Sequence, residues 1–210
     1  MDRESRVRII LDKRPLRSIL KWTQGALFSA AALTFLYCAV TIADAWIFQR
    51  REHRRLEQMS IHAATATKLA APPAAVSALD ERLIGSIEIS RLGISVIVIE
   101  GDDEATLRRA AGHIPNTGLP GQPGNVGIAA HRDTFFRPLR HVKRNDVVIF
   151  KTAAGEYRYR VVSVKIVKPA EVWVLNPDDG NQILTLVTCY PFYFVGSAPD
   201  RFIVRAERIA

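Results

Sequence analysis

The stretch IGSIEISRLGISVIVIE, residues 84–100, indicates the class of fold. Residues 84–89 and 94–100 are rich in β-branched side chains, and Arg91-Leu92-Gly93 separates the two runs. Such runs are typical of strands, and a glycine at the junction suits a hairpin turn or a bulge. The stretch therefore predicts two consecutive strands joined by a tight turn.

Strand-like runs continue to the C-terminus. We expect them at residues 125–130, 146–152, 156–167, 183–188 and 201–207. Between the first strands and these runs, Asp102–Ala111 carries acidic residues first and arginines later, which complements a helix dipole and predicts a helix of roughly two to three turns. Residues 112–124 are rich in Gly and Pro and predict a loop. About seven or eight short strands with few helices indicate an all-β barrel or sandwich.

The N-terminal part of the chain has a different character. Residues 25–43 (GALFSAAALTFLYCAVTIA) carry no charge, and at about 1.5 Å per residue they cover roughly 28 Å, close to the hydrocarbon thickness of a bilayer. Trp22 and Trp46 flank the segment, as interfacial aromatic residues do. The segment predicts an uncleaved transmembrane anchor. A buried core helix and a signal peptide cleaved near Ala43-Asp44-Ala45 are the alternatives.

The net charge of +8 is unevenly distributed. Residues 1–79 hold 12 Lys+Arg and 6 Asp+Glu, whereas residues 80–210 hold 17 and 15. Seven basic residues precede the apolar segment and four follow it closely, which predicts a cytoplasmic N-terminus and an extracytoplasmic C-terminal domain. The nearly neutral C-terminal domain lacks the basic footprint of a nucleic-acid-binding protein, so we expect no nucleic-acid partner.

These features divide the chain into four parts. We expect a basic cytoplasmic tail at 1–23, a transmembrane anchor at 24–48, a juxtamembrane segment with an Ala/Pro-rich stalk at 49–79, and a globular β domain at 80–210. The stalk follows from residues 61–78, which have almost no large apolar side chains to bury.

Three residues at strand ends carry candidate chemistry. Cys189 closes one strand-like run just before Pro191, and His131 closes another. A thiol near an imidazole fits a cysteine acyl-transfer enzyme, and Arg201, which begins the last run, could hold the charge that develops on an attacked carbonyl oxygen. A buried structural cysteine and a solvated surface arginine remain the alternatives.

Other titratable groups suggest no further site. We expect His113 and His141 in loops or at the surface. Asp102-Asp103-Glu104 is better explained as a helix start than as a cation site, and the C-terminal domain has no Cys/His cluster. We expect neither a metal nor a cofactor.

Three blocks together carry a family resemblance. TLVTCYPF (185–192) resembles the TLxTC signature of sortases, and GHIPNTGLPGQPGNVGIAAHRDTFF (112–136) resembles the block around the sortase histidine, particularly in the class D group. APDRFIVRA (198–206) resembles the block with the sortase arginine. The blocks occur in the family order, and the similarity covers roughly residues 83–209. Ala130 stands where many relatives have Gly.

The resemblance implies a closed eight-stranded β-barrel with short helices and a Cys–His–Arg active site. By the family pattern Cys189 is the nucleophile, His131 the general acid and base, and Arg201 the group that stabilises substrate and oxyanion. Thr188 would help to orient the substrate.

The implied activity is that of a membrane-anchored cysteine transpeptidase of the cell surface. It would cleave an LPxTG-like sorting signal near the C-terminus of secreted proteins through a thioester. It would then transfer the acyl group to an amine of the cell envelope or of another protein, such as a peptidoglycan precursor or a pilin lysine. Membrane lipid would be a further partner, through the N-terminal helix. A hydrolytic cysteine peptidase and a non-enzymatic β-barrel binding module are the alternatives.

Overall fold

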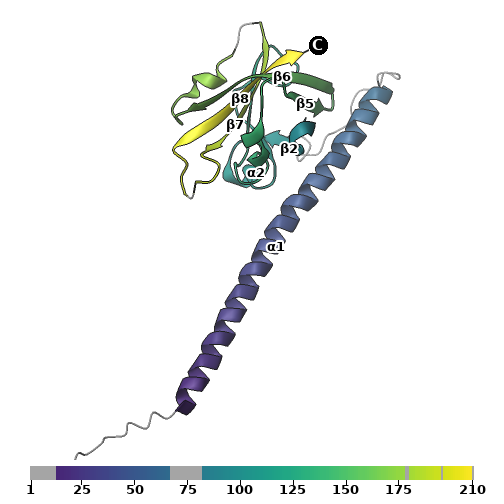
Figure 1. The fold of residues 1–210 in the computed structure, drawn as a ribbon. Helices are drawn as coiled ribbons and strands as arrows, with labels where there is room; N and C mark the ends of the chain where they lie inside the picture. Colours follow the sequence, from purple (N-terminus) through teal and green to yellow (C-terminus); the bar gives the residue numbers. More distant parts are fainter. Residues whose placement is uncertain (1–12, 67–81, 178–179, 195, 210) are drawn as a thin grey trace, which may run out of the picture. The chain divides into compact units, whose positions relative to one another are not determined.

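The computed structural model describes residues 13–66, 82–177, 180–194 and 196–209 (Figure 1). The first element is the long helix α1 (Lys13–Ala66), whose side chains are described from residue 19 to residue 59. The chain forms two compact units, Met1–Asp44 and Ala45–Ala210.

The first unit contains most of the apolar part of α1. The stretch Ile19–Met59 is long and apolar enough to cross a membrane, and none of its most apolar window is buried. Trp22 is 80% exposed and Phe35 is 79% exposed. A core helix would bury such side chains, so α1 is a candidate membrane anchor. A signal sequence shares these properties and stays the alternative.

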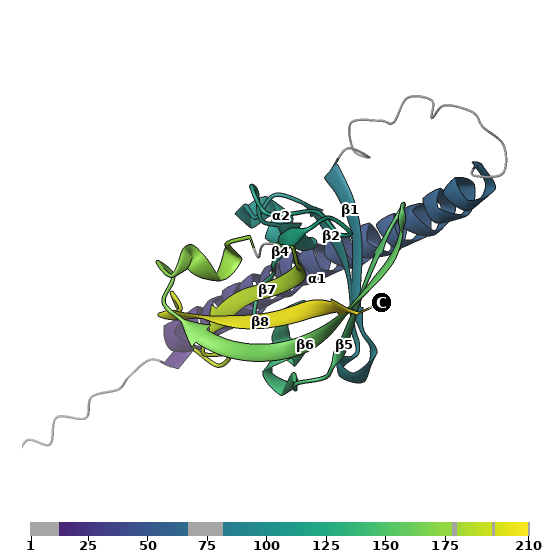
Figure 2. The same cartoon turned by 90° about the horizontal axis from the view of Figure 1, so that it is seen from above.

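The second unit contains a closed barrel, formed by eight strands within the described residues. They are β1 (Leu83–Ile89), β2 (Ile94–Glu100), β3 (Ala111–His113), β4 (Gly124–Ala129), β5 (Val147–Thr152), β6 (Gly155–Val167), β7 (Gln182–Tyr190) and β8 (Asp200–Ile209). Their order around the barrel is β1-β2-β3-β4-β7-β8-β6-β5, and β5 pairs with β1 to complete the ring (Figure 2). The all-β class and the closed eight-stranded barrel are confirmed, and the sandwich alternative is excluded.

The predicted tight turn joins β1 and β2. The strands are antiparallel with Ile89 opposite Ile94, and the short 3-10 helix η2 (Ser90–Leu92) lies between them. Gly93 has a φ of 64° and its N–H donates to the carbonyl of Ser90 at 3.1 Å. A side chain is disfavoured in this left-handed conformation, so the glycine makes the turn possible.

The predicted helix over residues 102–111 is only partly correct. The helix α2 (Glu104–Leu107) has four residues and begins after Asp103, whose carboxylate accepts from the backbone N–H groups of Ala105 and Thr106. The acidic residues therefore mark a helix start, as expected. The helix is short because residues 111–113 form β3 and pair with β2 in parallel, so non-local pairing overrides local helix propensity.

The core fills the inside of the barrel. Its largest fully buried side chains include Phe136, Leu139, Phe150 and Tyr159, together with isoleucines and leucines from β1, β4 and β7. Phe136 and Leu139 come from the connection between β4 and β5, where Leu139 belongs to the 3-10 helix η3 (Arg137–His141). The connection therefore closes one end of the core.

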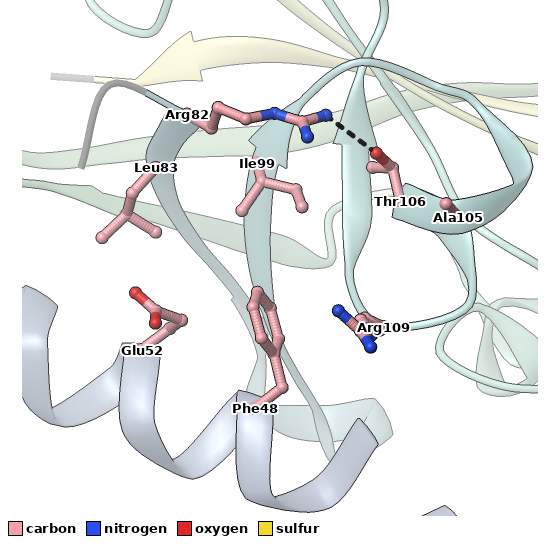
Figure 3. A pocket seen from close by; sticks show the side chains of 8 residues that line it. All are labelled: Phe48, Glu52, Arg82, Leu83, Ile99, Ala105, Thr106 and Arg109. Atoms are coloured by element: carbon pink, nitrogen blue, oxygen red, sulfur yellow. Dashed lines mark hydrogen bonds between the residues drawn. The ribbon is translucent and has the colours of Figure 1, made fainter. Parts of the chain in front are cut away.

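The second unit also includes the last part of α1, from Ala45 onward. Leu56 is 6% exposed, and Gln49 accepts from the backbone N–H of Ile97 at 2.9 Å and donates to the carbonyl of Arg109 at 2.6 Å. In Figure 3, Phe48 and Glu52 point from the helix toward β1 and β2 and line a cavity of about 150 Å³.

The helix α1 continues through the juxtamembrane segment into the first residues of the expected stalk, and the division into anchor, stalk and domain stays a prediction. Residues 49–66 are helical and packed through Gln49 and Leu56, whereas residues 67–79 lie outside the described residues. Parallel β3 covers β2 only from Val98 to Glu100, so the glutamine amide bonds the Ile97 N–H that lies just before this pairing.

Candidate active site

Cys189 and Arg201 lie opposite each other on neighbouring strands. β7 and β8 are antiparallel, and their register pairs Cys189 with Arg201, between the pairs Thr188–Phe202 and Tyr190–Asp200. Directly paired residues have Cα atoms about 4.5–5.5 Å apart, with side chains on the same face of the sheet. Both side chains are half-buried, so they are fixed by strands and still reachable from solvent.

His131 reaches the same end of the barrel from β4. Strands β4 and β7 are parallel, with Ala129 opposite Val187, and the N–H of Ala130 donates to the carbonyl of Val187 at 3.2 Å. His131 lies two residues beyond this last pair on one strand, as Cys189 does on the other. The carbonyl of His131 then accepts from the N–H of Phe136 at 3.1 Å, so the chain turns directly after the histidine.

A hydroxyl group ties these two strand ends together. Thr188 is 2% exposed, and its Oγ1 donates to the carbonyl of Ala130 at 2.7 Å. The bond joins the residue before Cys189 to the residue before His131. The Thr188 hydroxyl therefore makes a hydrogen bond within the protein. The role of Thr188 in orienting a substrate stays a prediction.

The guanidinium group of Arg201 is held by its own loop. Its Nη1 donates to the carbonyls of Asp200 at 3.1 Å and Ala198 at 3.3 Å. The Asp200 carboxylate in turn accepts from Nζ of Lys168 at 2.7 Å. A cation oriented in this way beside a thiol is suited to stabilise a developing oxyanion, and an imidazole at the adjoining strand end is suited to move a proton.

Comparison with known proteins shows the family of the chain. The family model described as the Sortase domain matches residues 87–209, more than half of the chain. The chain belongs to the sortase family.

Individual sortases show how far the similarity extends. Sortase D of Bacillus subtilis (strain 168) is 31% identical over 125 residues, which cover 60% of this chain and 63% of that protein. Sortase A of Streptococcus agalactiae serotype III (strain NEM316) is 29% identical over 133 residues, covering 60% of this chain and 52% of that protein. This sortase thus spans less than two thirds of the length of these relatives. The resemblance to the class D group is confirmed by the first of them.

Solved structures share the fold. A sortase D5 transpeptidase of Clostridium perfringens superposes with a TM-score of 0.62 at 22% identity, covering 80% of this chain and 99% of that one. A lid mutant of sortase A from Corynebacterium diphtheriae superposes with a TM-score of 0.58 at 27% identity, covering 75% and 95%. The barrel of this chain therefore has the same fold as the barrels of these solved sortases.

An aromatic cluster borders the site of this sortase, and sequence reasoning missed it. Tyr190 stacks on Phe202 with ring centroids 6.1 Å apart, and Phe192 meets Phe202 edge-on at 5.1 Å. The sequence signal is the pair of aromatic residues just after Cys189. The cluster anchors both strands next to the thiol through apolar contact.

The expectation for His113 is wrong, because this histidine is 3% exposed and lies on β3. Pairing of β3 with β2 sets it beside Glu100, and its Nδ1 lies 2.8 Å from the carboxylate oxygen Oε2. Its Nε2 lies 2.9 Å from the carbonyl oxygen of Gly118, so both ring nitrogens face oxygen atoms. His113 thereby ties the following loop to the barrel. His141 is exposed, as expected.

An ion pair between Arg91 and Asp146 stabilises the turn between β1 and β2. The guanidinium of Arg91, in η2, donates through Nε and Nη2 to both carboxylate oxygens of Asp146, and Nη2 also donates to the carbonyl of His141. These bonds lower the pKa of the Asp146 carboxyl below its usual value, since they favour the ionised form. The pair connects the β1–β2 turn to the start of β5.

The acidic residues near the start of α2 do not form a metal site. Among the described residues, no group of three or more His, Cys, Asp or Glu side chains is placed to hold a metal ion. The Asp103 carboxylate instead caps α2 and accepts from the hydroxyl of Thr106 at 2.8 Å.

Proposed function

We propose that this sortase is a membrane-anchored cysteine transpeptidase that uses Cys189 as nucleophile. The observation that carries the proposal is the placement of Cys189 opposite Arg201 in the β7–β8 register, with His131 at the adjoining end of β4. Cys189 and Arg201 are paired across neighbouring strands, and His131 follows the end of the strand that adjoins β7, which supports a shared site for the three groups. This is the constellation that thiol acyl transfer requires.

The first half-reaction forms a thioester. The Cys189 thiolate attacks a backbone carbonyl carbon within an LPxTG-like sorting signal, and Arg201 stabilises the resulting oxyanion. The C–N bond then breaks, and His131, as the imidazolium, donates its proton to the departing amine. The N-terminal fragment of the substrate remains bound to the sulfur.

The second half-reaction consumes the thioester. An acceptor amine attacks the same carbonyl carbon and gives its proton to His131, and the C–S bond breaks to restore the thiolate. The product contains a new amide. A peptidoglycan precursor or a pilin lysine would supply the amine, and secreted proteins with a C-terminal sorting signal would supply the acyl group.

Mass spectrometry of the full chain in detergent micelles tests this chemistry. Incubation with a library of sorting-signal peptides is expected to add the mass of the N-terminal peptide fragment to Cys189. Cys189→Ala should form no adduct while its far-ultraviolet circular dichroism is unchanged. Cys38→Ala is the matched control, since Cys38 lies in the apolar segment, and it should react as the unmodified chain does.

The product then separates the alternatives. Addition of an amine acceptor should release ligated peptide. Cleaved peptide alone, with every acceptor tried, would identify a peptidase instead, and full activity of Cys189→Ala would indicate a different nucleophile.

We infer that the N-terminus faces the cytoplasm and the barrel lies outside, with α1 in contact with membrane lipid. Seven basic residues before the apolar segment against four after it support this orientation. In intact cells producing Cys38→Ala, a membrane-impermeant maleimide should label Cys189. Labelling only after lysis would place the barrel inside.

A further inference from the structure

The loop that joins β7 to β8 is held by an arginine from another part of the chain. It comprises residues 191–199, of which the structure describes all but residue 195, and it connects the strand with Cys189 to the strand with Arg201. Arg132 donates through Nη1 to the carbonyl of Pro191 at 3.0 Å. Its Nη2 donates to the carbonyls of Phe194 at 2.6 Å and Gly196 at 3.1 Å.

This contact is well suited to fix the backbone of the loop. The guanidinium is planar and carries its donors in a rigid fork, so one side chain can hold several carbonyls at once. Bonds from a charged donor are also shorter and stronger than those between neutral groups. The guanidinium carbon lies 5.9 Å from the ring centroid of Phe194, which adds a contact with a side chain of the loop.

The loop has few apolar anchors of its own beyond its first residues. Tyr193 is 76% exposed and Phe194 is 44% exposed, so neither ring contributes much burial. The N–H of Phe194 donates to the carbonyl of Pro191 at a long 3.3 Å. Arg201 donates one hydrogen bond to the loop, at the carbonyl of Ala198, and Arg140 lies 5.5 Å from the ring centroid of Tyr193. Arg132 donates three, to carbonyls in the first part of the loop, and is therefore well placed to fix that part.

Arg132 is next to a candidate catalytic residue in the chain. It directly follows His131, so a single dipeptide supplies the candidate acid–base group and the donor that orders the loop between Cys189 and Arg201. We propose that Arg132 is a positioning residue for acyl transfer, which acts by fixing the β7–β8 loop at the site. The expected effect of Arg132 on turnover rests on the proposed function, whereas its expected effect on the order of the loop does not.

Three variants of the full chain, all in a Cys38→Ala background, test the proposal. Arg132→Ala removes the three contacts, and Arg132→Lys keeps the charge without the planar fork. Arg158→Ala is the control, because Arg158 is exposed, bonds Glu156 through its side chain, and lies nine positions before Val167, which pairs with Arg201. At about 3.3 Å per residue, it is roughly 30 Å away along β6.

The first measurement is turnover with a sorting-signal peptide and an amine. We expect Arg132→Ala to lower kcat at least tenfold while KM changes less than threefold, because the guanidinium bonds protein carbonyls rather than substrate. Arg132→Lys should recover part of the loss, and Arg158→Ala should stay within twofold of the parent. A kcat for Arg132→Ala within twofold of the parent would overturn the proposal, as would a loss explained by unfolding in both Arg132 variants.

The second measurement does not depend on turnover. Hydrogen–deuterium exchange of residues 191–199 should speed up at least tenfold in Arg132→Ala, with the exchange of β6 unchanged. Alkylation of Cys189 by iodoacetamide should become at least threefold faster as the loop opens. If the parent chain forms no acyl-enzyme, the proposed function fails, and these two rates decide the role of Arg132 alone: unchanged rates overturn it.

Discussion

The buried hydroxyl of Thr188 provides the sharpest test of how the site is held together. Thr188→Val keeps the β-branched shape but replaces the donor with a methyl group. The carbonyl of Ala130, a residue that is 4% exposed, then loses the hydrogen bond from Oγ1 that the structure gives it at 2.7 Å. The change leaves a buried acceptor without this partner at the junction between β4 and β7.

The cost can be worked out from that bond. Leaving a buried acceptor unsatisfied costs about 1–3 kcal/mol. For a domain of this size each kcal/mol lowers Tm by about 2–4 °C, so Thr188→Val should lower Tm by about 2–12 °C. Thr188→Ser is the matched control: it keeps the donor and removes one methyl group, at a cost of about 1 kcal/mol.

Thr188→Val should also lower the rate of acyl-enzyme formation. The bond holds the ends of the strands that carry Cys189 and His131, and a misplacement of about 1 Å can lower a rate roughly 100-fold. We expect the rate of acyl-enzyme formation by Thr188→Val to fall about 10- to 100-fold at a temperature where the protein is folded. Thr188→Ser should stay within about fivefold of the parent.

Thermal unfolding followed by fluorescence measures Tm, and intact-mass kinetics on the same preparation measures the rate of acyl-enzyme formation. The reasoning is refuted if Thr188→Val matches the unmodified chain in stability and rate, or if Thr188→Ser loses as much as Thr188→Val. The first result would mean that the hydroxyl is dispensable, and the second that the methyl group matters instead.

Two further changes test other parts of the domain. The pKa of Asp146 is lowered in the folded state by its bonds to Arg91, so its stabilising effect is present above the unfolded pKa of about 3.9 and is lost as the pH falls through the lower, folded value. Asp146→Asn should therefore be less stable by about 1–3 kcal/mol at pH 7, with a smaller difference at pH 3 in urea titrations; an equal difference at both pH values would contradict this. Gln49→Ala removes both hydrogen bonds of the amide, so it should cost about 1–3 kcal/mol and speed hydrogen exchange of the Ile97 amide. Equal exchange of that amide in the variant and the parent would mean that α1 does not cover this edge.

Much of the fold was predictable because its signals are local. The runs at 84–89 and 94–100 are rich in β-branched residues, as strands are, and Gly93 lies where the turn needs a left-handed residue. The strand ends that carry Cys189 and Arg201 were equally visible, since each lies at the boundary of an apolar run.

The errors arose where distant segments meet. His113 follows an alanine-rich stretch and precedes a Gly/Pro-rich one, so its neighbours indicate a loop, but pairing with β2 makes it a buried strand residue. Gln49 directly precedes Arg50 and Arg51, and nothing in these residue types indicates its hydrogen bond with the N–H of Ile97.

Arg132 shows why such contacts are hidden from the sequence. Its acceptors are backbone carbonyls 59, 62 and 64 positions further along the chain. Because every residue has a backbone carbonyl, the residue types of the loop do not indicate which carbonyls accept from Arg132.

The sequence alone indicated every strand of the barrel except β3, the apolar segment that could cross a membrane, and the thiol, imidazole and guanidinium that could carry the chemistry. These depend on local periodicity and on residue type, which can be read directly. The tertiary structure was needed to show the order of the strands around the barrel and the pairing of Cys189 with Arg201. It also decided that Arg132 reaches the loop between them. Such pairings depend on the free energy of burial and hydrogen bonding summed over segments far apart in the chain, which no single stretch of sequence contains.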